Sequence, residues 1–317
     1  MRFFKSCSNV SRMKRRSPET PAADAARQYH VAGQTLTASK LPSGLYPVAT
    51  PIGNLGDITL RALEILAAAD VIACEDTRVT RKLLDRYGIT TPLTPYHDHN
   101  AATVRPKIMA RLQAGEAVAL VSDAGTPLIS DPGYKLVRAA RDDGHAVMAA
   151  PGPSALLAAL TVAGLATDRF YFDGFLPPRQ TARDARIREL SRISATLVLF
   201  ETGPRLAATL AALAATLGSR EAAVCRELTK LHEEVRSANL DELAAEYFSA
   251  PAPKGEIVIV IAPPVETVKA GKDEVDDLLR RALARVSVKD AVAEVSAASG
   301  VARREVYRRA IMLVQGT

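Results

Sequence analysis

The stretch LYPVATPIGNLGDITLRALEIL (45–66) contains a short apolar strand, a loop with proline and glycine, and the start of an amphipathic helix. A strand that runs through such a loop into a helix is the layout of a nucleotide-binding turn. The spacing of Gly53 and Gly56 does not match the dinucleotide pattern GxGxxG, and no GxxxxGK[ST] motif is present in this stretch. The loop is therefore either a plain turn, with Asp57 capping the helix, or a site for a ligand that needs neither phosphate motif.

Strands and helices alternate beyond this stretch. Apolar runs predict four strands in the first half of the chain, at 45–50, 71–75, 117–122 and 146–151. Amphipathic segments predict helices between them, at 58–69, 80–88, 102–115 and 134–144. Because the strands are continuous apolar runs, they indicate a parallel sheet that is covered on both faces.

The character of the chain changes between residues 152 and 168. Four further apolar runs predict the strands of a second sheet, at 170–176, 195–200, 222–228 and 255–263. Residues 263–274 are typical of a linker, and three helices follow it. Ser287 and Asp290 have the spacing of a helix cap, and Gly300 separates the last two helices as in a helix-turn-helix.

The charge of +6 lies in the first 40 residues, which hold eight basic and two acidic side chains, while the other 277 residues balance. This pattern predicts a solvated basic extension, or one that touches RNA. The three cysteines lie far apart without a CxxC motif, which indicates neither a zinc site nor a disulfide framework and favours the cytoplasm. The longest apolar run, 155–166, is too short to span a membrane.

Three further loops carry polar side chains: CEDTRVTRK (74–82), YHDHN (96–100) and SDAGTPLISDPGYK (122–135). The first and the third directly follow predicted strands. In an open parallel sheet, ligands bind at the carboxyl ends of the strands. The first loop is either a helix start capped by Asp76 or a polar cluster that faces a cleft. The two histidines of the second loop lack a third metal ligand, so we expect a substrate loop and no metal site.

Nine segments occur here in the order that one known family has: VATPIGNLGDITLRALE, EDTRVTRKLL, HDHN, LVSDAGTPLISDPGYKLV, PGPSALLAAL, FYFDGFLP, ETGPRL, CRELTKLHEEV and KGEIVIVI. Over residues 44–263 the sequence resembles the 16S rRNA (cytidine-2′-O)-methyltransferases of the tetrapyrrole-methylase superfamily. The C-terminal helices fit this family as well, and the first 40 residues match nothing.

This resemblance implies an α/β fold with two αβα domains of the class III S-adenosylmethionine (SAM) methyltransferase type, plus a small C-terminal helical domain. It also implies a cytoplasmic homodimer. The expected units are a disordered basic extension over 1–42, an N-terminal αβα domain over 43–152, a C-terminal αβα domain over 153–265, and a helix-turn-helix-like tail over 273–317.

The resemblance further implies that SAM lies in the cleft between the two αβα domains. The residues expected to bind it in the first domain and at the junction are Pro51, Ile52, Gly53, Asp123, Gly125, Thr126, Ile129, Ser130, Ser154 and Ala155. The residues expected to reach the adenine side from the second domain are Phe172, Thr202 and Gly255.

The implied reaction is displacement at the sulfonium methyl by the 2′-hydroxyl of a cytidine in 16S rRNA, in the decoding region of the 30S subunit. Our hypothesis is that Glu75 or Asp76 takes the proton and that Arg78 orients the substrate. His97 and His99 are rival bases in the substrate loop. The basic side chains expected to contact RNA phosphates are Arg81, Arg179, Arg205, Arg303, Arg304 and Arg308.

Three other functions are weighed against this one. A SAM-dependent methylase of a tetrapyrrole or another small molecule would have the same fold, but the EDTR and HDHN segments and the basic C-terminal helices argue against it. A non-enzymatic ribosome assembly factor would retain only the shape of the pocket. A nicotinamide oxidoreductase is excluded because the GxGxxG motif and the ribose-binding acid are missing.

Overall fold

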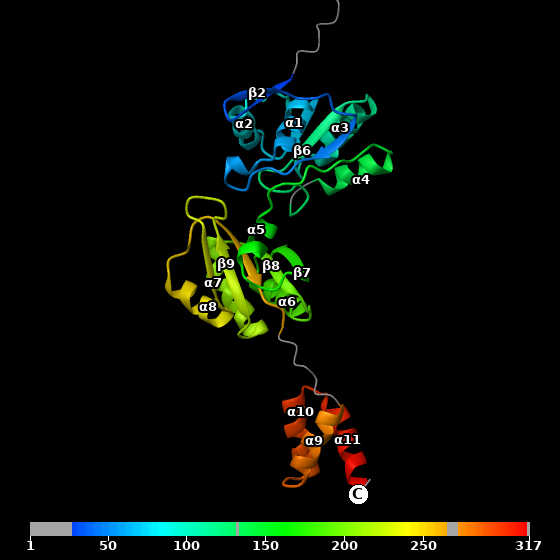
Figure 1. Ribbon diagram of the computed structural model, residues 1–317, viewed down its shortest axis with the longest axis vertical. Coiled ribbons are helices and arrows are strands. Elements are labelled where there is room, and N and C mark those ends of the chain that lie inside the picture. The colour runs from blue at the N-terminus through cyan, green and yellow to red at the C-terminus, as the bar shows by residue number, and fades with distance from the viewer. Residues whose placement is uncertain (1–26, 131–132, 265–271, 316–317) are drawn as a thin grey trace, which may run out of the picture.

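The computed structural model describes residues 27–130, 133–264 and 272–315 (Figure 1). Two α/β units and a helical bundle follow one another along the chain. Residues 1–26, most of the predicted basic extension, lie outside the described residues, as does most of the predicted linker.

The first unit contains a parallel four-stranded sheet in the order β3-β6-β4-β5. Its strands are β3 (Gly44–Pro47), β4 (Val71–Cys74), β5 (Leu93–Pro95) and β6 (Ala117–Val121). Its helices are α1 (Leu60–Ala68), α2 (Thr77–Arg86), α3 (Ala101–Gln113) and α4 (Tyr134–Asp142), with a short 3-10 helix at Leu55–Asp57. The predicted parallel sheet is confirmed, although β5 was not expected.

Both faces of this sheet are covered, as its apolar strands indicate. On β4, Ile72 and Cys74 pack with α1 and α2 in one core cluster, whereas Val71 and Ala73 pack with α3 and α4 in another. Successive side chains of a strand point to opposite faces, so this alternation divides the core into two layers. All four of these side chains are buried.

The segment 146–151 does not form the regular strand that its composition predicts. It lies beside β3 and makes isolated parallel bridges, Leu45 with Val147 and Val48 with Ala150. Backbone hydrogen bonds join the two segments, including Met148 N–H to the Leu45 carbonyl at 2.9 Å. The segment therefore completes the edge of the sheet without a continuous ladder.

The expectation of disorder over 1–42 is wrong for residues 27–42. Residues 28–37 form an antiparallel hairpin of β1 (Gln28–Val31) and β2 (Gln34–Thr37). Tyr29 is buried in the core cluster of α1 and α2. The guanidinium of Arg27 pairs with Asp70 at 2.8 Å and donates to the carbonyls that end α1. These contacts offset the polar composition that suggested disorder.

The second unit contains a mixed five-stranded sheet in the order β10-β9-β11-β8-β7. Its strands are β7 (Phe170–Phe175), β8 (Thr196–Thr202), β9 (Glu221–Arg226), β10 (Glu234–Asn239) and β11 (Glu256–Ile261). Its helices are α5 (Ala155–Val162), α6 (Gln180–Leu190), α7 (Gly203–Leu217) and α8 (Leu240–Ser249). The sequence did not predict β10 and α8.

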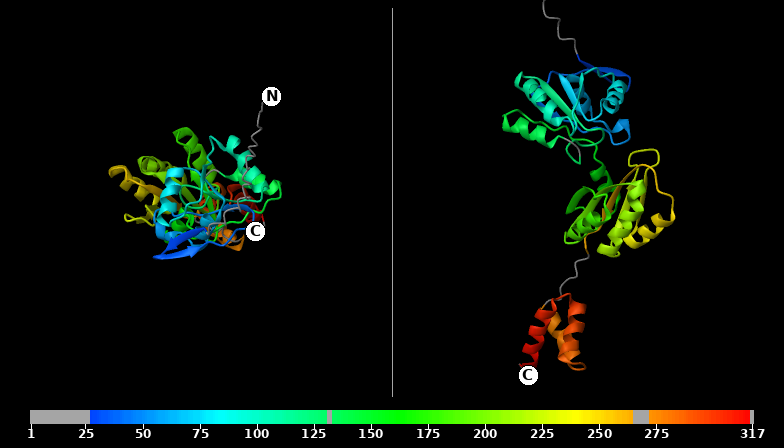
Figure 2. Two further views of the ribbon diagram at one scale, coloured as in Figure 1. Left: turned by 90° about the horizontal axis from the view of Figure 1, so that it is seen from above. Right: turned by 180° about the vertical axis from the view of Figure 1, so that it is seen from behind.

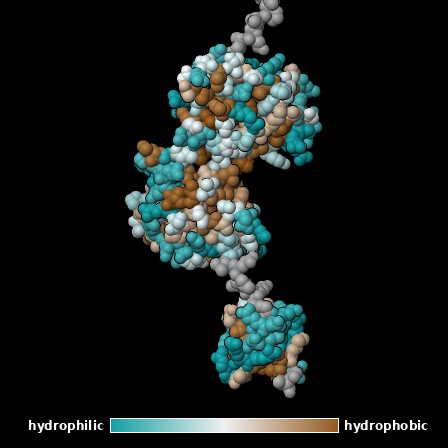
Figure 3. Space-filling view, viewed as in Figure 1, coloured by the Kyte–Doolittle hydropathy of each residue, from teal (hydrophilic) through white to brown (hydrophobic). Residues whose placement is uncertain are grey.

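Helix α5 lies between the two units in Figure 1 and in the view from behind in Figure 2. It shares a core cluster with β8, β9 and β11. Ile52, from the loop after β3 of the first unit, is buried in the same cluster. The space-filling view shows apolar surface along the notch between the two units (Figure 3).

Three helices form the C-terminal bundle: α9 (Lys272–Leu283), α10 (Val288–Ser299) and α11 (Arg303–Gln315). They share one core of small aliphatic side chains. Ser287 caps α10 by accepting from Asp290 N–H, and Gly300 ends it with φ 64°. Both features were predicted from the sequence. No helix within the described ranges is long and apolar enough to cross a bilayer.

Candidate cofactor and substrate site

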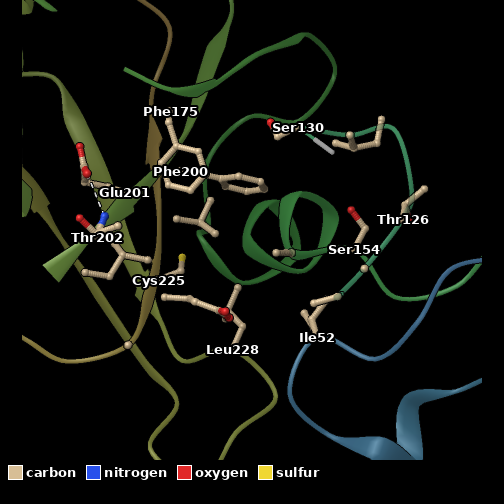
Figure 4. A pocket seen from close by; sticks show the side chains of 18 residues that line it. Ile52, Thr126, Ser130, Ser154, Phe175, Phe200, Glu201, Thr202, Cys225 and Leu228 are labelled. Carbon is tan, nitrogen blue, oxygen red and sulfur yellow. Dashed lines mark hydrogen bonds between the residues drawn. The ribbon is translucent and has the colours of Figure 1, made fainter. Parts of the chain in front are cut away.

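A cavity lies between the two α/β units and is built from loops at strand ends (Figure 4). The loops after β3 and β6 and the start of α5 form one wall. The C-terminal ends of β7, β8 and β9 and the start of β11 form the other. Its lining residues are Ile52, Ala124, Gly125, Thr126, Ile129, Ser130, Ser154, Ala155, Phe175, Phe200, Glu201, Thr202, Cys225, Leu228, Gly255, Glu256, Ile257 and Val258.

Backbone contacts hold the wall from the first unit in place. Thr50 and Gly125 exchange two backbone hydrogen bonds of 2.9 and 3.0 Å, which join the loop after β3 to the loop after β6. Gly125 has φ 78°, a left-handed conformation that favours glycine. The Thr126 hydroxyl donates to the Pro153 carbonyl at 3.1 Å, which connects these loops to α5.

The wall from the second unit is mainly apolar. The ring centroid of Phe200 lies 4.8 Å from that of Phe172 and 5.6 Å from that of Phe175, both edge-to-face. Leu228 adds a further apolar side chain to the lining, and burial raises the pKa of the Cys225 thiol to about 11, so it stays neutral. Such a wall suits an aromatic base.

The lining contains two carboxylates and no lysine or arginine. Each carboxylate has a cationic partner outside the lining, Arg205 for Glu201 and Lys230 for Glu256. A pyrophosphate would require cations or a glycine-rich anion loop, and neither lines this cavity. SAM carries a sulfonium and an ammonium cation, an aromatic base and ribose hydroxyls, so these residues fit it.

Nine of the thirteen residues expected to bind the cofactor line the cavity. The other four do not: Pro51, Gly53, Asp123 and Phe172. Gly53 is next to Ile52, and Asp123 is next to Ala124, so these two lie one residue behind the lining. Phe172 supports the ring of Phe200 from behind. The role of each residue in binding stays a prediction.

The catalytic candidates lie at the end of β4. Asp76 caps α2 by accepting from Arg78 N–H at 2.8 Å, and its carboxylate pairs with the Arg78 guanidinium at 2.6 Å. These hydrogen bonds lower the pKa of Asp76 to about 2. A carboxylate held at such a low pKa is a poor proton acceptor near neutral pH, which weighs against Asp76 as the base. Its expected role as a helix cap is confirmed.

The substrate-loop histidines lie after β5. The rings of His97 and His99 meet edge-on, with centroids 5.9 Å apart. Asn100 anchors the loop by accepting from His97 N–H at 2.9 Å. Nδ1 of His97 is buried and has no hydrogen-bond partner among the described atoms. Arg81 is half-buried on α2.

The arginines expected to contact RNA differ in their environments. Arg179 is exposed at the start of α6, and Arg303, Arg304 and Arg308 are exposed on α11. Arg205 differs because it lies 3.2 Å from the buried carboxylate of Glu201 and donates to the Leu176 carbonyl at 2.6 Å. These partners hold Arg205 within the second unit, which weighs against its expected role at a phosphate.

Sequence reasoning missed much of the wall from the second unit. Phe175, Phe200 and Leu228 lie at the ends of predicted strands, Glu201 follows one directly, and Cys225 lies within one. The carboxyl ends of these strands were the available signal. That signal was weak because antiparallel neighbours put strand ends at both edges of a sheet, so position alone does not mark the ligand edge.

Family models and solved structures match this chain. The model of the tetrapyrrole (corrin/porphyrin) methylases matches residues 44–244, and that of the RsmI C-terminal HTH domain matches residues 269–313. Among solved structures, uroporphyrin-III-C-methyltransferase from Thermus thermophilus aligns with a TM-score of 0.50 at 20% identity, over 69% of this chain and 94% of that chain. Diphthine synthase aligns with a TM-score of 0.54 at 18% identity, over 69% and 89%. These likenesses show the fold.

Relatives of higher identity define the family. Ribosomal RNA small subunit methyltransferase I of Mesorhizobium japonicum is 51% identical, over 89% of this chain and 96% of its own length. The protein of the same name from Escherichia coli O157:H7 is 42% identical, over 88% and 98%. The chain therefore belongs to the tetrapyrrole methylases and, within them, to the ribosomal RNA small subunit methyltransferase I family. A methyltransferase with SAM as its cofactor, as the sequence predicted, is confirmed.

Proposed function

We propose that this chain transfers a methyl group from SAM to the 2′-hydroxyl of a cytidine in the 16S rRNA of the 30S subunit, in the cytoplasm. The printed name of its relatives, a methyltransferase of the small subunit rRNA, supports this substrate class. In the reaction a C–O bond forms, the S–CH₃ bond breaks, the hydroxyl loses its proton, and S-adenosylhomocysteine leaves.

One observation carries the proposal: the cavity combines an apolar aromatic wall with two carboxylates and no lysine or arginine. SAM supplies an activated methyl group, so the protein mainly has to align it with the nucleophile. Loops from two separate sheets form the cavity, and the polar loop 74–82 lies at the edge of the first sheet. A ribose placed against that loop would face the cavity.

The side chains at the end of β4 would handle the proton and the substrate. We assign the proton to Glu75 and not to Asp76, because Asp76 caps α2 and pairs with Arg78. Arg78 has a side chain that is 87% exposed, so it can reach a phosphate of the substrate. His97 and His99 are the alternative proton acceptors.

RNA binding would use arginines outside the cavity, of which Arg81 is half-buried and the others are exposed. Arg81 and Arg179 lie on the two α/β units, and Arg303, Arg304 and Arg308 lie on the bundle. Arginine side chains neutralise phosphates and release counterions, so each contact adds to the salt dependence of binding.

We also propose a homodimer, as the family resemblance implies. Exposed apolar side chains on α5 and on the edge strand β7 support it, since monomers rarely leave such groups together in water. These side chains are Leu157, Val162, Phe170 and Tyr171. Light scattering after chromatography tests this proposal: the protein should have twice the chain mass, and Leu157→Asp should reduce it to one chain mass.

The proposed reaction is tested with SAM labelled in the methyl group and 30S subunits from a strain that lacks this gene. Nuclease digestion then identifies the modified nucleoside. A labelled 2′-O-methylcytidine supports the proposal. Label on another nucleoside, or none on 30S subunits when SAM binding is intact, would contradict it.

A further inference from the structure

Two glycines from different units flank one ion pair beside the cavity. Gly53 lies in the loop after β3, and Gly255 lies just before β11. A β-carbon on Gly53 would overlap the alkyl chain of Lys230, and one on Gly255 would overlap the carboxylate of Glu227. The space that two β-carbons would fill is thus occupied by the side chains of this pair.

The pair is tightly bonded. Nζ of Lys230 lies 2.7 Å from Oε1 of Glu227 and 3.1 Å from Oε2 of Glu256. The same oxygen of Glu227 accepts from Glu256 N–H at 3.0 Å. Burial alone would lower the pKa of Lys230, but its hydrogen bonds to the two glutamates raise it overall. The hydrogen bond to Lys230 lowers the pKa of Glu227, so both groups stay charged at neutral pH.

The turn that carries the pair is held in an unfavourable backbone conformation. Glu227 has φ 52° and Thr229 has φ 68°, values that are rare for residues other than glycine and unusual for a β-branched threonine. Such conformations persist only where the surroundings fix them, and they cluster at ligand sites. Between these two residues, Leu228 lines the cavity.

We propose that Lys230 is a cofactor-positioning residue: its alkyl chain presses on Gly53 of the first unit, and its ammonium holds the Glu227 turn of the second. The residues next to its contacts, Ile52 and Leu228, line opposite walls of the cavity. The clamp therefore sets the separation of these walls. Lys230 itself is not among the lining residues, so it acts through them and not by touching the cofactor.

The inference rests on the proposed use of SAM, and the test separates the two. Lys230→Met keeps an alkyl chain of similar length and removes the charge. Calorimetry gives the Kd for SAM, and a chase of radiolabelled SAM gives its dissociation rate, both without RNA. Loss of the two charge-assisted hydrogen bonds of Lys230, to Glu227 and Glu256, should raise the Kd and the dissociation rate about tenfold. No SAM binding by the unaltered protein would instead refute the proposed function.

A double-mutant cycle shows whether the clamp acts as one unit. Glu227→Gln keeps an oxygen that can accept from Glu256 N–H but removes the charge that Lys230 pairs with. Each single variant should weaken SAM binding, and the double variant should bind no worse than the single variants. Lys289→Met, on the exposed surface of α10, is the matched control and should bind SAM normally.

The cycle also distinguishes a positioning role from general stabilisation. The thermal unfolding temperature without SAM is measured for every variant. Unchanged SAM dissociation in Lys230→Met would overturn the proposal, whatever the unfolding temperature. Additive effects in the double variant would overturn the clamp, because two independent contacts would then be present.

Discussion

The backbone N–H of Asp76 donates a hydrogen bond of 2.9 Å to Oδ1 of Asp123. Asp123 lies two residues after the end of β6, and Asp76 lies two residues after the end of β4. The bond therefore joins the carboxyl ends of two adjacent parallel strands. Ala124 and Gly125, which line the cavity, follow Asp123 directly. The loop 74–82, which carries the catalytic candidates, is therefore held at a fixed place relative to the cofactor wall.

Removal of this acceptor should separate the two loops. In Asp123→Ala, the partly buried N–H of Asp76 loses its partner, which should lower the free energy of unfolding by about 1–2 kcal/mol. We expect methyl transfer to slow more than this loss of stability explains, because the loop 74–82 is displaced. Urea unfolding and initial rates at saturating SAM measure the two effects. Asp123→Asn keeps an acceptor oxygen and should be milder, so equal losses in both variants would argue against this bond.

The pH dependence of the reaction tests whether Asp76 accepts the proton. Its pKa is lowered from 3.8 to about 2 by its hydrogen bonds with Arg78. Since the folded value lies below the ordinary one, the stabilisation is fully present above about pH 4 and is lost as the pH falls toward 2. Asp76 therefore stays ionised throughout the pH range of an assay.

We expect Asp76→Asn to keep the shape of the pH–rate profile between pH 5 and 9. Asparagine also caps helices, so α2 should stay folded while the pair with Arg78 is lost. Glu75→Gln should lose most of its rate at every pH. An acid limb that disappears in Asp76→Asn would show that Asp76 is the base after all.

The first sheet and its loops could be predicted because parallel strands end at one edge, and the apolar runs mark those ends. The loops 50–57 and 122–135 were located in this way, whereas the individual cofactor residues, such as Gly125 and Ser154, came from the family resemblance. The hairpin of β1 and β2 could not be predicted, because its strands are short and polar and depend on tertiary contacts of Tyr29. Strand β10 is also largely exposed, so its sequence carries no apolar run.

The pairing of side chains could not be predicted from the sequence. Arg205 and Glu201 are four residues apart, yet nothing in that spacing shows that the carboxylate is fully buried. The clamp of Lys230 on Gly53 joins residues 177 positions apart across two units. Contacts of this kind follow from how the two units meet, and periodicity within one element does not determine that.

Arg205→Ala should destabilise the second unit and leave RNA binding unchanged. The Glu201 carboxylate is buried and also accepts from Thr209 at 2.7 Å and from Thr202 N–H at 2.8 Å. Loss of the arginine leaves this charge without its cation and should cost about 2–3 kcal/mol, below the full value for a buried pair because Arg205 is 28% exposed. Chemical unfolding measures the cost. A reduced salt dependence of RNA binding in this variant would restore its role at a phosphate.

The bundle offers a matched test of RNA contact. Arg304 and Arg308 lie four residues apart on the exposed face of α11, and no acidic partner is found for them among the described residues. Arg285, in contrast, is paired with Glu294. Replacing Arg304 or Arg308 with alanine should weaken binding to 30S subunits and reduce the slope of log K against log salt by about one for each. Arg285→Ala, the control, should leave the slope of log K against log salt unchanged. If the slope is the same in all three variants, the RNA does not contact Arg304 or Arg308.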